Sequence, residues 1–120
     1  MSEIESHRDL AVWQKVMALA EESYRLAARF PESERFGLWS QLTRCATSVP
    51  ANIAEGHGRF GSREFANFLS IARGSLSELE THLELAVRLG YIREADALMA
   101  RNLASEVGKM LTRLIQSLRR

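Results

Sequence analysis

The strongest constraint in this sequence is an apolar seam that keeps a helical rhythm through the second half of the chain. Apolar and small residues recur there at alternating spacings of four and three residues, at Phe65, Leu69, Ala72, Leu76, Leu79, Leu83, Ala86 and Gly90. This rhythm follows the turn of an α-helix, whereas a half-buried strand alternates with a period of two. The seam therefore predicts a long amphipathic helix over residues 62–89.

Three other segments carry the same rhythm and predict helices over about 9–30, 38–56 and 94–118. The first of them follows a capping-box pattern at Ser6 and Asp9, which we expect to start the helix, and it stops before Pro31. Two adjacent apolar stripes run along it: Leu10, Trp13, Met17, Ala20, Tyr24 and Ala27, and Val12, Val16, Leu19, Leu26 and Phe30. A face this broad is expected to meet two neighbouring helices.

Single residues predict the details of the other helices. Ser62 is expected to cap the helix over 62–89, and Gly90 with the apolar residues after it predicts a left-handed C-terminal cap. Pro50 falls inside the helix over 38–56, where it removes a backbone donor, so we expect a kink in that helix.

The composition supports an all-α class. The 120 residues include only two prolines and seven glycines, too few for an all-β domain that turns every few residues, while 46% are hydrophobic and 26% are charged. Four amphipathic helices joined mostly by short connections predict an antiparallel up-down-up-down four-helix bundle. We expect residues 1–120 to form a single domain.

The sequence offers no set of residues suited to catalysis, and we expect a protein that is not an enzyme. A di-iron bundle needs Glu-x-x-His pairs, and the nearest approach is Glu78 with His82, four residues apart. Spacing typical of zinc sites is missing too, and Cys45 lies on an apolar stripe, where a free cysteine is usually a small buried hydrophobe. We therefore expect no metal, no cofactor and no small-molecule substrate.

The location of the protein is expected to be the cytoplasm. Residues 1–5 lack the basic and apolar regions of a signal peptide, and one cysteine cannot form an intramolecular disulfide. Charged residues interrupt every apolar run well before the roughly 20 residues that cross a bilayer, so we expect no association with a membrane.

Charge is unevenly distributed although the formal net charge is only +1. The balance is −2 over residues 1–35, +2 over 36–73, −3 over 74–100 and +4 over 101–120. If the two basic segments converge in space, they form a cationic patch suited to phosphate groups. The candidate nucleic-acid-binding residues are Arg44, Arg59, Arg63, Arg73, Lys109 and Arg113. The alternative is a solvated face in which some of these charges are paired, for example Arg59 with Glu55, and a basic last turn that suits the helix dipole.

Residues 48–56, Ser-Val-Pro-Ala-Asn-Ile-Ala-Glu-Gly, followed by Gly58 and Arg59, resemble the bacterial four-helix-bundle family of 23S rRNA intervening-sequence proteins. Residues 9–15, 37–42 and 65–81 match the pattern of that family in the same order. The signature positions, which we interpret as structural, are Pro50, Asn52, Glu55, Gly56, Ser75 and Glu78.

The resemblance implies a homo-oligomer without enzymatic activity. Accessory proteins of diversity-generating retroelements look similar to this family and form pentameric barrels that bind nucleic acid, so a pentamer that binds structured RNA or DNA is expected. The alternative is a scaffold protein that acts through protein–protein contacts alone. In a scaffold, the arginines pair with acidic segments of neighbouring subunits, and neutralising Arg73 or Glu78 dissociates the oligomer.

Overall fold

The computed structural model describes residues 6–120, and these form four α-helices and no strand. Residues 1–5, on which the prediction about a signal peptide rests, lie outside the described part. The helices are α1 (Ala11–Ala27), α2 (Leu38–His57), α3 (Ser62–Arg88) and α4 (Glu94–Leu118). The predicted all-α class is confirmed.

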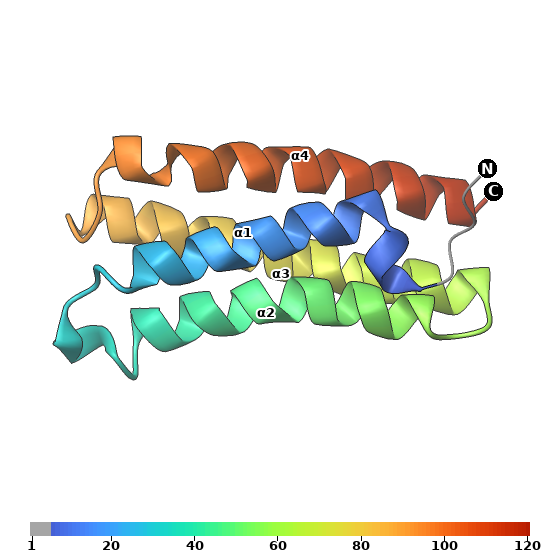
Figure 1. The fold of residues 1–120 in the computed structure, drawn as a ribbon, viewed down its shortest axis with the longest axis horizontal. Helices are drawn as coiled ribbons and strands as arrows, with labels where there is room; N and C mark the ends of the chain where they lie inside the picture. Colours follow the sequence, from blue (N-terminus) through green and yellow to red (C-terminus); the bar gives the residue numbers. More distant parts are fainter. Residues whose placement is uncertain (1–5) are drawn as a thin grey trace.

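The helices lie side by side along the long axis of the molecule (Figure 1). Each helix contacts two others: α1 packs on α2 and α4, and α3 packs on the same two helices from the other side. Figure 1 shows the α2–α3 connection and the end of α4 at one end of the molecule, and the other two connections at the opposite end. This arrangement brings the basic residues of the α2–α3 connection and those at the end of α4 to the same end.

The core fills the space between the four helices. Its largest fully buried side chains are Leu19, Leu42, Ile53, Leu69, Leu79, Leu83 and Leu111. From Leu69 to Ala86, the α3 seam is buried, as its rhythm predicted. On α1 the stripe with Val12, Val16, Leu19 and Leu26 is buried. The other stripe is mixed: Ala20 and Ala27 are buried, whereas Tyr24 is exposed. Part of the broad apolar face of α1 is therefore left uncovered by the neighbouring helices.

The first helix is shorter than the predicted range of 9–30. The capping box forms, with Ser6 N–H donating to Asp9 at 3.1 Å, but it closes a 3₁₀ turn, His7–Asp9. Leu10 then adopts an extended conformation, so the α-helix begins only at Ala11. At the other end, bonds from Arg29 to Leu26 and from Phe30 to Ala27 tighten the chain ahead of the proline. The other three helices agree with the predicted ranges to within one residue at each end.

The C-terminus of α3 has the predicted left-handed cap. Gly90 has a φ of 77°, the single positive φ among the described residues. Its N–H donates to Val87, and the N–H of Tyr91 donates to Ala86, which is the Schellman arrangement. The predicted cap at the other end of α3 is wrong: Ser62 is the first helical residue, and Gly61 before it offers no side chain.

Helix α2 runs without interruption through Pro50, which is buried. Because proline cannot donate to the carbonyl of Ala46, one helical hydrogen bond is missing there. The kink expected at this position stays a prediction. Within residues 6–120, no helix is long and apolar enough to cross a membrane.

Candidate functional site

Three of the signature positions, Gly56, Ser75 and Glu78, lie where α2 packs on α3, whereas Pro50 faces α1. Gly56 is buried at this contact, and a Cβ built on it would come within 2.6 Å of the Phe68 Cβ. No real Cβ contact is that short, so glycine allows the two helix backbones to approach each other. The position is required by packing.

A small polar network joins the same two helices one turn away. The hydroxyls of Ser48 and Ser75 lie 2.9 Å apart, and the Asn52 amide donates to the Ser48 carbonyl at 2.8 Å and to its hydroxyl at 3.1 Å. Ser75 is buried, so its hydroxyl needs a partner, and Ser48 provides one. The contact between Ser48 and Ser75 and the close approach at Gly56 therefore hold α2 against α3, and Asn52 binds Ser48 within α2.

Arg59, at the α2–α3 connection, has its charge compensated. Its guanidinium lies 3.6 Å from Glu55 and 3.8 Å from Glu64, and it covers the Phe68 ring. The pairing with Glu55 at i, i+4 is confirmed. These contacts engage the guanidinium on both sides, so Arg59 is a weak candidate for binding phosphate.

Three predicted nucleic-acid-binding residues meet in a groove between α3 and α4. This groove, about 510 Å³ in volume, is lined by Arg73, Lys109 and Arg113, with Glu80 as its one acidic residue. We call it the α3–α4 groove. Ser77, Ser105 and Thr112 add hydroxyl groups to its walls. Arg73 reaches across the groove toward the Thr112 hydroxyl, at 3.5 Å.

None of these three cations has an ion-pair partner among the described residues. By contrast, other basic side chains do form ion pairs with carboxylates, among them Lys15, Arg25, Arg29, Arg88 and Arg101. Arg119 continues the basic row, and its guanidinium donates to Ser70 at 3.3 Å. Arg63 is exposed on the first turn of α3. Arg44 lies on α2, which does not contact α4, and is therefore away from the groove.

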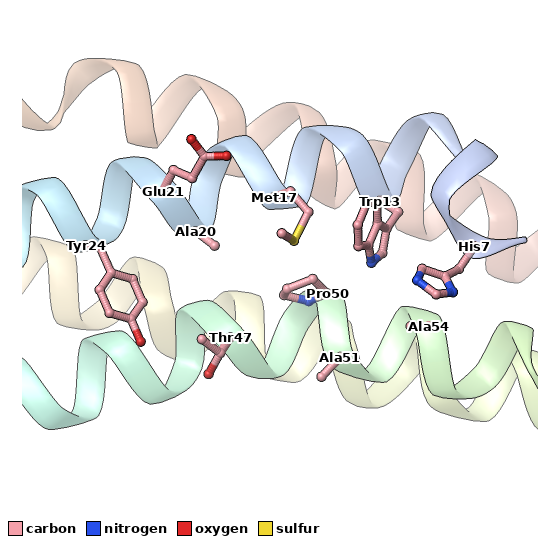
Figure 2. Close-up of a pocket in the computed structure, with 10 residues that line it drawn as sticks. All are labelled: His7, Trp13, Met17, Ala20, Glu21, Tyr24, Thr47, Pro50, Ala51 and Ala54. Atoms are coloured by element: carbon pink, nitrogen blue, oxygen red, sulfur yellow. The ribbon is translucent and has the colours of Figure 1, made fainter.

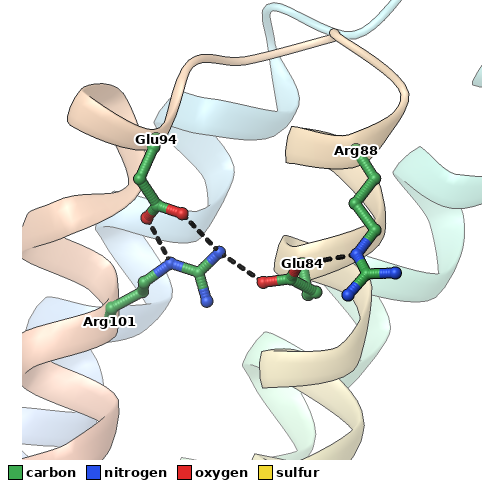
Figure 3. Close-up of polar contacts among 4 residues, drawn as sticks. All are labelled: Glu84, Arg88, Glu94 and Arg101. Atoms are coloured by element: carbon green, nitrogen blue, oxygen red, sulfur yellow. Dashed lines mark hydrogen bonds and ion pairs between the residues drawn. The ribbon is translucent and has the colours of Figure 1, made fainter.

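At the opposite end of the α3–α4 pair, basic and acidic side chains form a network of ion pairs. Arg101 lies 2.7 Å from Glu84 and 2.6 Å from Glu94, and Glu84 also binds Arg88 at 2.8 Å (Figure 3). These contacts lower the pKa of the Glu84 carboxyl. Among the basic residues of 101–120, Arg101 is therefore paired with carboxylates, whereas those from Lys109 onward form no ion pair within residues 6–120.

A second groove runs between α1 and α2. Figure 2 shows Trp13, Met17 and Tyr24 facing Pro50 and the alanines of α2 across it. The groove has a volume of about 650 Å³, and Glu21 is its one acidic residue. We call it the α1–α2 groove. Its α1 wall comes from the stripe that contains Tyr24, which is only partly covered by the core.

Comparison with known proteins identifies the family. The model of the 23S rRNA-intervening sequence proteins matches residues 8–113. The chain belongs to this family. Its fold is similar to that of a protein of unknown function from the S23 ribosomal protein family of Bacteroides thetaiotaomicron VPI-5482, with a TM-score of 0.81 and 30% sequence identity, covering 88% of this chain and 98% of the other. Among curated proteins nothing matches.

The fold of this 23S rRNA-intervening sequence protein also creates a cluster that the sequence did not predict. Cys45 of α2 lies next to Glu78 and His82 of α3, and the thiol donates to a Glu78 oxygen at 3.8 Å. Burial and the Glu78 charge raise the pKa of the Cys45 thiol. The i, i+4 spacing of Glu78 and His82 was visible in the sequence, but the approach of a cysteine 33 residues away was not.

Proposed function

We propose that this protein is a non-enzymatic homo-oligomer that binds the phosphate backbone of structured RNA or DNA through the α3–α4 groove. The observation that carries the proposal is the meeting of Arg73, Lys109 and Arg113 in one groove without acidic partners. A cation without an ion pair can bind an external anion directly, whereas a paired cation first has to break its contact with a carboxylate.

The chemistry of the groove suits phosphate oxygens. The guanidinium groups of Arg73 and Arg113 can donate two parallel hydrogen bonds to a phosphate, and Lys109 adds a point charge. The hydroxyls of Ser77 and Thr112 can donate to the remaining oxygens. None of these contacts reads a base, so the groove supports binding by shape and charge. With a net charge of only +1, attraction is local to the groove.

Self-assembly is proposed through the α1–α2 groove. Its walls are mostly apolar, and Tyr24 and Trp39 extend the exposed apolar surface, with 44% and 37% of each residue exposed. Exposed apolar side chains that lie together in a groove favour contact with another protein surface. A pentamer, which the family resemblance implies, would bring several α3–α4 grooves into one assembly and multiply their affinity for a long nucleic acid.

The scaffold alternative is favoured by the same apolar groove. In that function the assembly forms but no nucleic acid binds. In this alternative, Arg73 and Glu78 make ion pairs between subunits, which is compatible with an Arg73 that contacts Thr112 but forms no ion pair among residues 6–120. The two functions therefore differ in one measurable property, which is the affinity of the wild-type protein for nucleic acid.

The test is fluorescence anisotropy with a labelled structured ribosomal RNA fragment and a labelled duplex DNA at several salt concentrations. We compare the wild type with a triple variant, Arg73→Ala/Lys109→Ala/Arg113→Ala. The matched control is Arg25→Ala/Arg88→Ala/Arg93→Ala, which removes three exposed arginines that are already in ion pairs. Both variants lower the net charge by three.

We expect the wild type to bind with a log affinity that falls linearly with log salt. On duplex DNA the triple variant should lose about 0.9 of slope for each phosphate contact that is removed. The control should keep the wild-type slope. Equal losses in both variants would show a general charge effect and overturn the assignment to the groove. No binding at low salt would leave the scaffold function.

A further inference from the structure

Three potential metal ligands from two helices converge beside the α2–α3 contact. The thiol of Cys45, a carboxylate oxygen of Glu78 and an imidazole nitrogen of His82 all lie within 4.8 Å of one another. Glu78 and His82 are one helical turn apart on α3, so their side chains lie on the same face, and α2 presents Cys45 to that face. The tight α2–α3 packing around Gly56 keeps the two helices close.

The distances are close to those of a coordination shell. In a tetrahedral zinc site, bonds of about 2.0 Å to nitrogen or oxygen and 2.3 Å to sulfur place the nitrogen and oxygen ligands about 3.3 Å apart and the sulfur about 3.5 Å from either of them. The sulfur of Cys45 lies 3.8 Å from the Glu78 oxygen, slightly farther than in such a site. The Glu78 side chain is exposed at the edge of the cluster, so rotation about its bonds can close the remaining gap.

One nitrogen of the His82 imidazole lacks a partner. His82 Nε2 is buried and has no hydrogen-bond partner, and it is the one buried side-chain nitrogen or oxygen in residues 6–120 in this condition. A buried polar atom without a partner costs free energy, so such atoms are rare and need an explanation. A bound cation would provide one, since a neutral imidazole offers its lone pair to a metal.

We propose that Cys45, Glu78 and His82 form a three-ligand site for a divalent transition metal of the zinc(II) class, with water in the fourth position. Thiolate and imidazole are the ligands that zinc prefers, and the thiolate and carboxylate charges together balance a divalent ion. On binding, the thiol proton that now faces Glu78 leaves to solvent, and sulfur bonds to the metal. The exposed Glu78 side gives the ion and water access. This inference is independent of nucleic-acid binding.

The first test uses cobalt(II) with the full-length, metal-free, reduced wild-type protein. Cys45 is the single cysteine of the chain, so any thiolate-to-cobalt charge-transfer absorption has to come from it. We expect this absorption to saturate at one cobalt per chain and to disappear when zinc(II) is added. Absence of the band overturns the proposal, as does saturation at one cobalt for two chains, because the ion would then be shared between chains.

The second test measures zinc affinity by calorimetry in Cys45→Ala, Glu78→Gln and His82→Gln. Loss of even an outer partner of a metal ligand costs about 10–100-fold in affinity, so each variant should lose at least about tenfold. The control is His57→Gln, which changes a histidine at the end of α2 that packs on Phe65 outside the cluster. Far-ultraviolet circular dichroism checks that each variant is helical. Unchanged cobalt absorption in both Glu78→Gln and His82→Gln would show that the cysteine binds metal alone and would overturn the site.

Discussion

The hydroxyl of Tyr91 donates a hydrogen bond of 2.6 Å to the carboxylate of Glu34, which lies 57 residues earlier in the chain. The other oxygen of that carboxylate accepts the N–H of Leu38 at 2.9 Å, at the first turn of α2. One side chain therefore caps α2 and ties the α3–α4 connection to the α1–α2 connection. Both hydrogen bonds favour the charged carboxylate, so they lower the pKa of Glu34, with the Leu38 contact contributing most.

Replacing Tyr91 with phenylalanine should lower the urea midpoint of unfolding at pH 7. Because the pKa of Glu34 is lower in the folded state than its ordinary value of 4.5, the stabilisation is fully present above that value and is lost as the pH falls below it. The difference in urea midpoint between wild type and Tyr91→Phe should therefore become smaller in acid. Tyr24→Phe, which changes an exposed tyrosine without this partner, is the control. A gap that stays constant from pH 7 to acid would contradict the role of Glu34.

Gly56→Ala should destabilise the protein by about 1–3 kcal/mol, the usual range for overpacking a tight contact. The added methyl group meets Phe68, whose backbone-proximal Cβ cannot move away without shifting α3. The matched control is Gly74→Ala within α3, where a Cβ meets nothing within 4 Å. That change should stabilise the helix by up to about 1 kcal/mol through helix propensity. Chemical unfolding measures both, and changes of the same sign would refute the packing argument.

Asp96 should make the protein sensitive to acid. It binds Arg93, accepts the Arg93 N–H, and pairs with Arg29 beyond the end of α1 at 3.1 Å, so its pKa is lowered from 3.8 to about 2. The stabilisation is present above pH 3.8 and is lost as the pH falls toward 2. Acid titration of wild type and Asp96→Asn can be monitored by circular dichroism. Between pH 3.8 and 2, the variant should lose less stability than the wild type.

Glu32→Gln serves as the control for this titration, because Glu32 is an exposed carboxylate on the α1–α2 connection that forms no ion pair with any residue of 6–120. Its titration should match that of the wild type. If Glu32→Gln and Asp96→Asn shift the acid transition equally, the effect comes from general charge rather than from the Asp96 contacts.

Ala51→Glu should dissociate the proposed homo-oligomer. Ala51 is an exposed residue that lines the α1–α2 groove, and a carboxylate there would lose its water if another chain covered the groove. Light scattering coupled to size exclusion should give a lower mass than for the wild type. Ala18→Glu, at an exposed alanine of α1 outside the groove, should keep the wild-type mass. An unchanged mass in Ala51→Glu would place the assembly contact elsewhere.

Much of the secondary structure could be predicted because its causes are local. The rhythm from Leu69 to Ala86 reflects a repeat within one helix, and Gly90 stops that helix through its own backbone freedom. Local patterns were misleading where two structures satisfy them equally. The Ser6 capping box is compatible with a 3₁₀ turn as well as with an α-helix, and Gly61 starts α3 without a side-chain cap.

The residues of the candidate site could be proposed from the sequence, but not their grouping. The spacing of Glu55 and Arg59 predicted their ion pair, but not the second contact of Arg59 with Glu64. Nor did the sequence show that Arg73 lies in a groove with residues of α4 and has no ion pair among residues 6–120. Cys45 was expected to be an inert apolar residue, and α3 places a carboxylate and an imidazole beside it. By itself the sequence determined the helices and their apolar faces, since these depend on neighbours three and four residues away. Only the tertiary structure decided which charges are paired and which ligands converge, because those depend on contacts between helices distant in the chain.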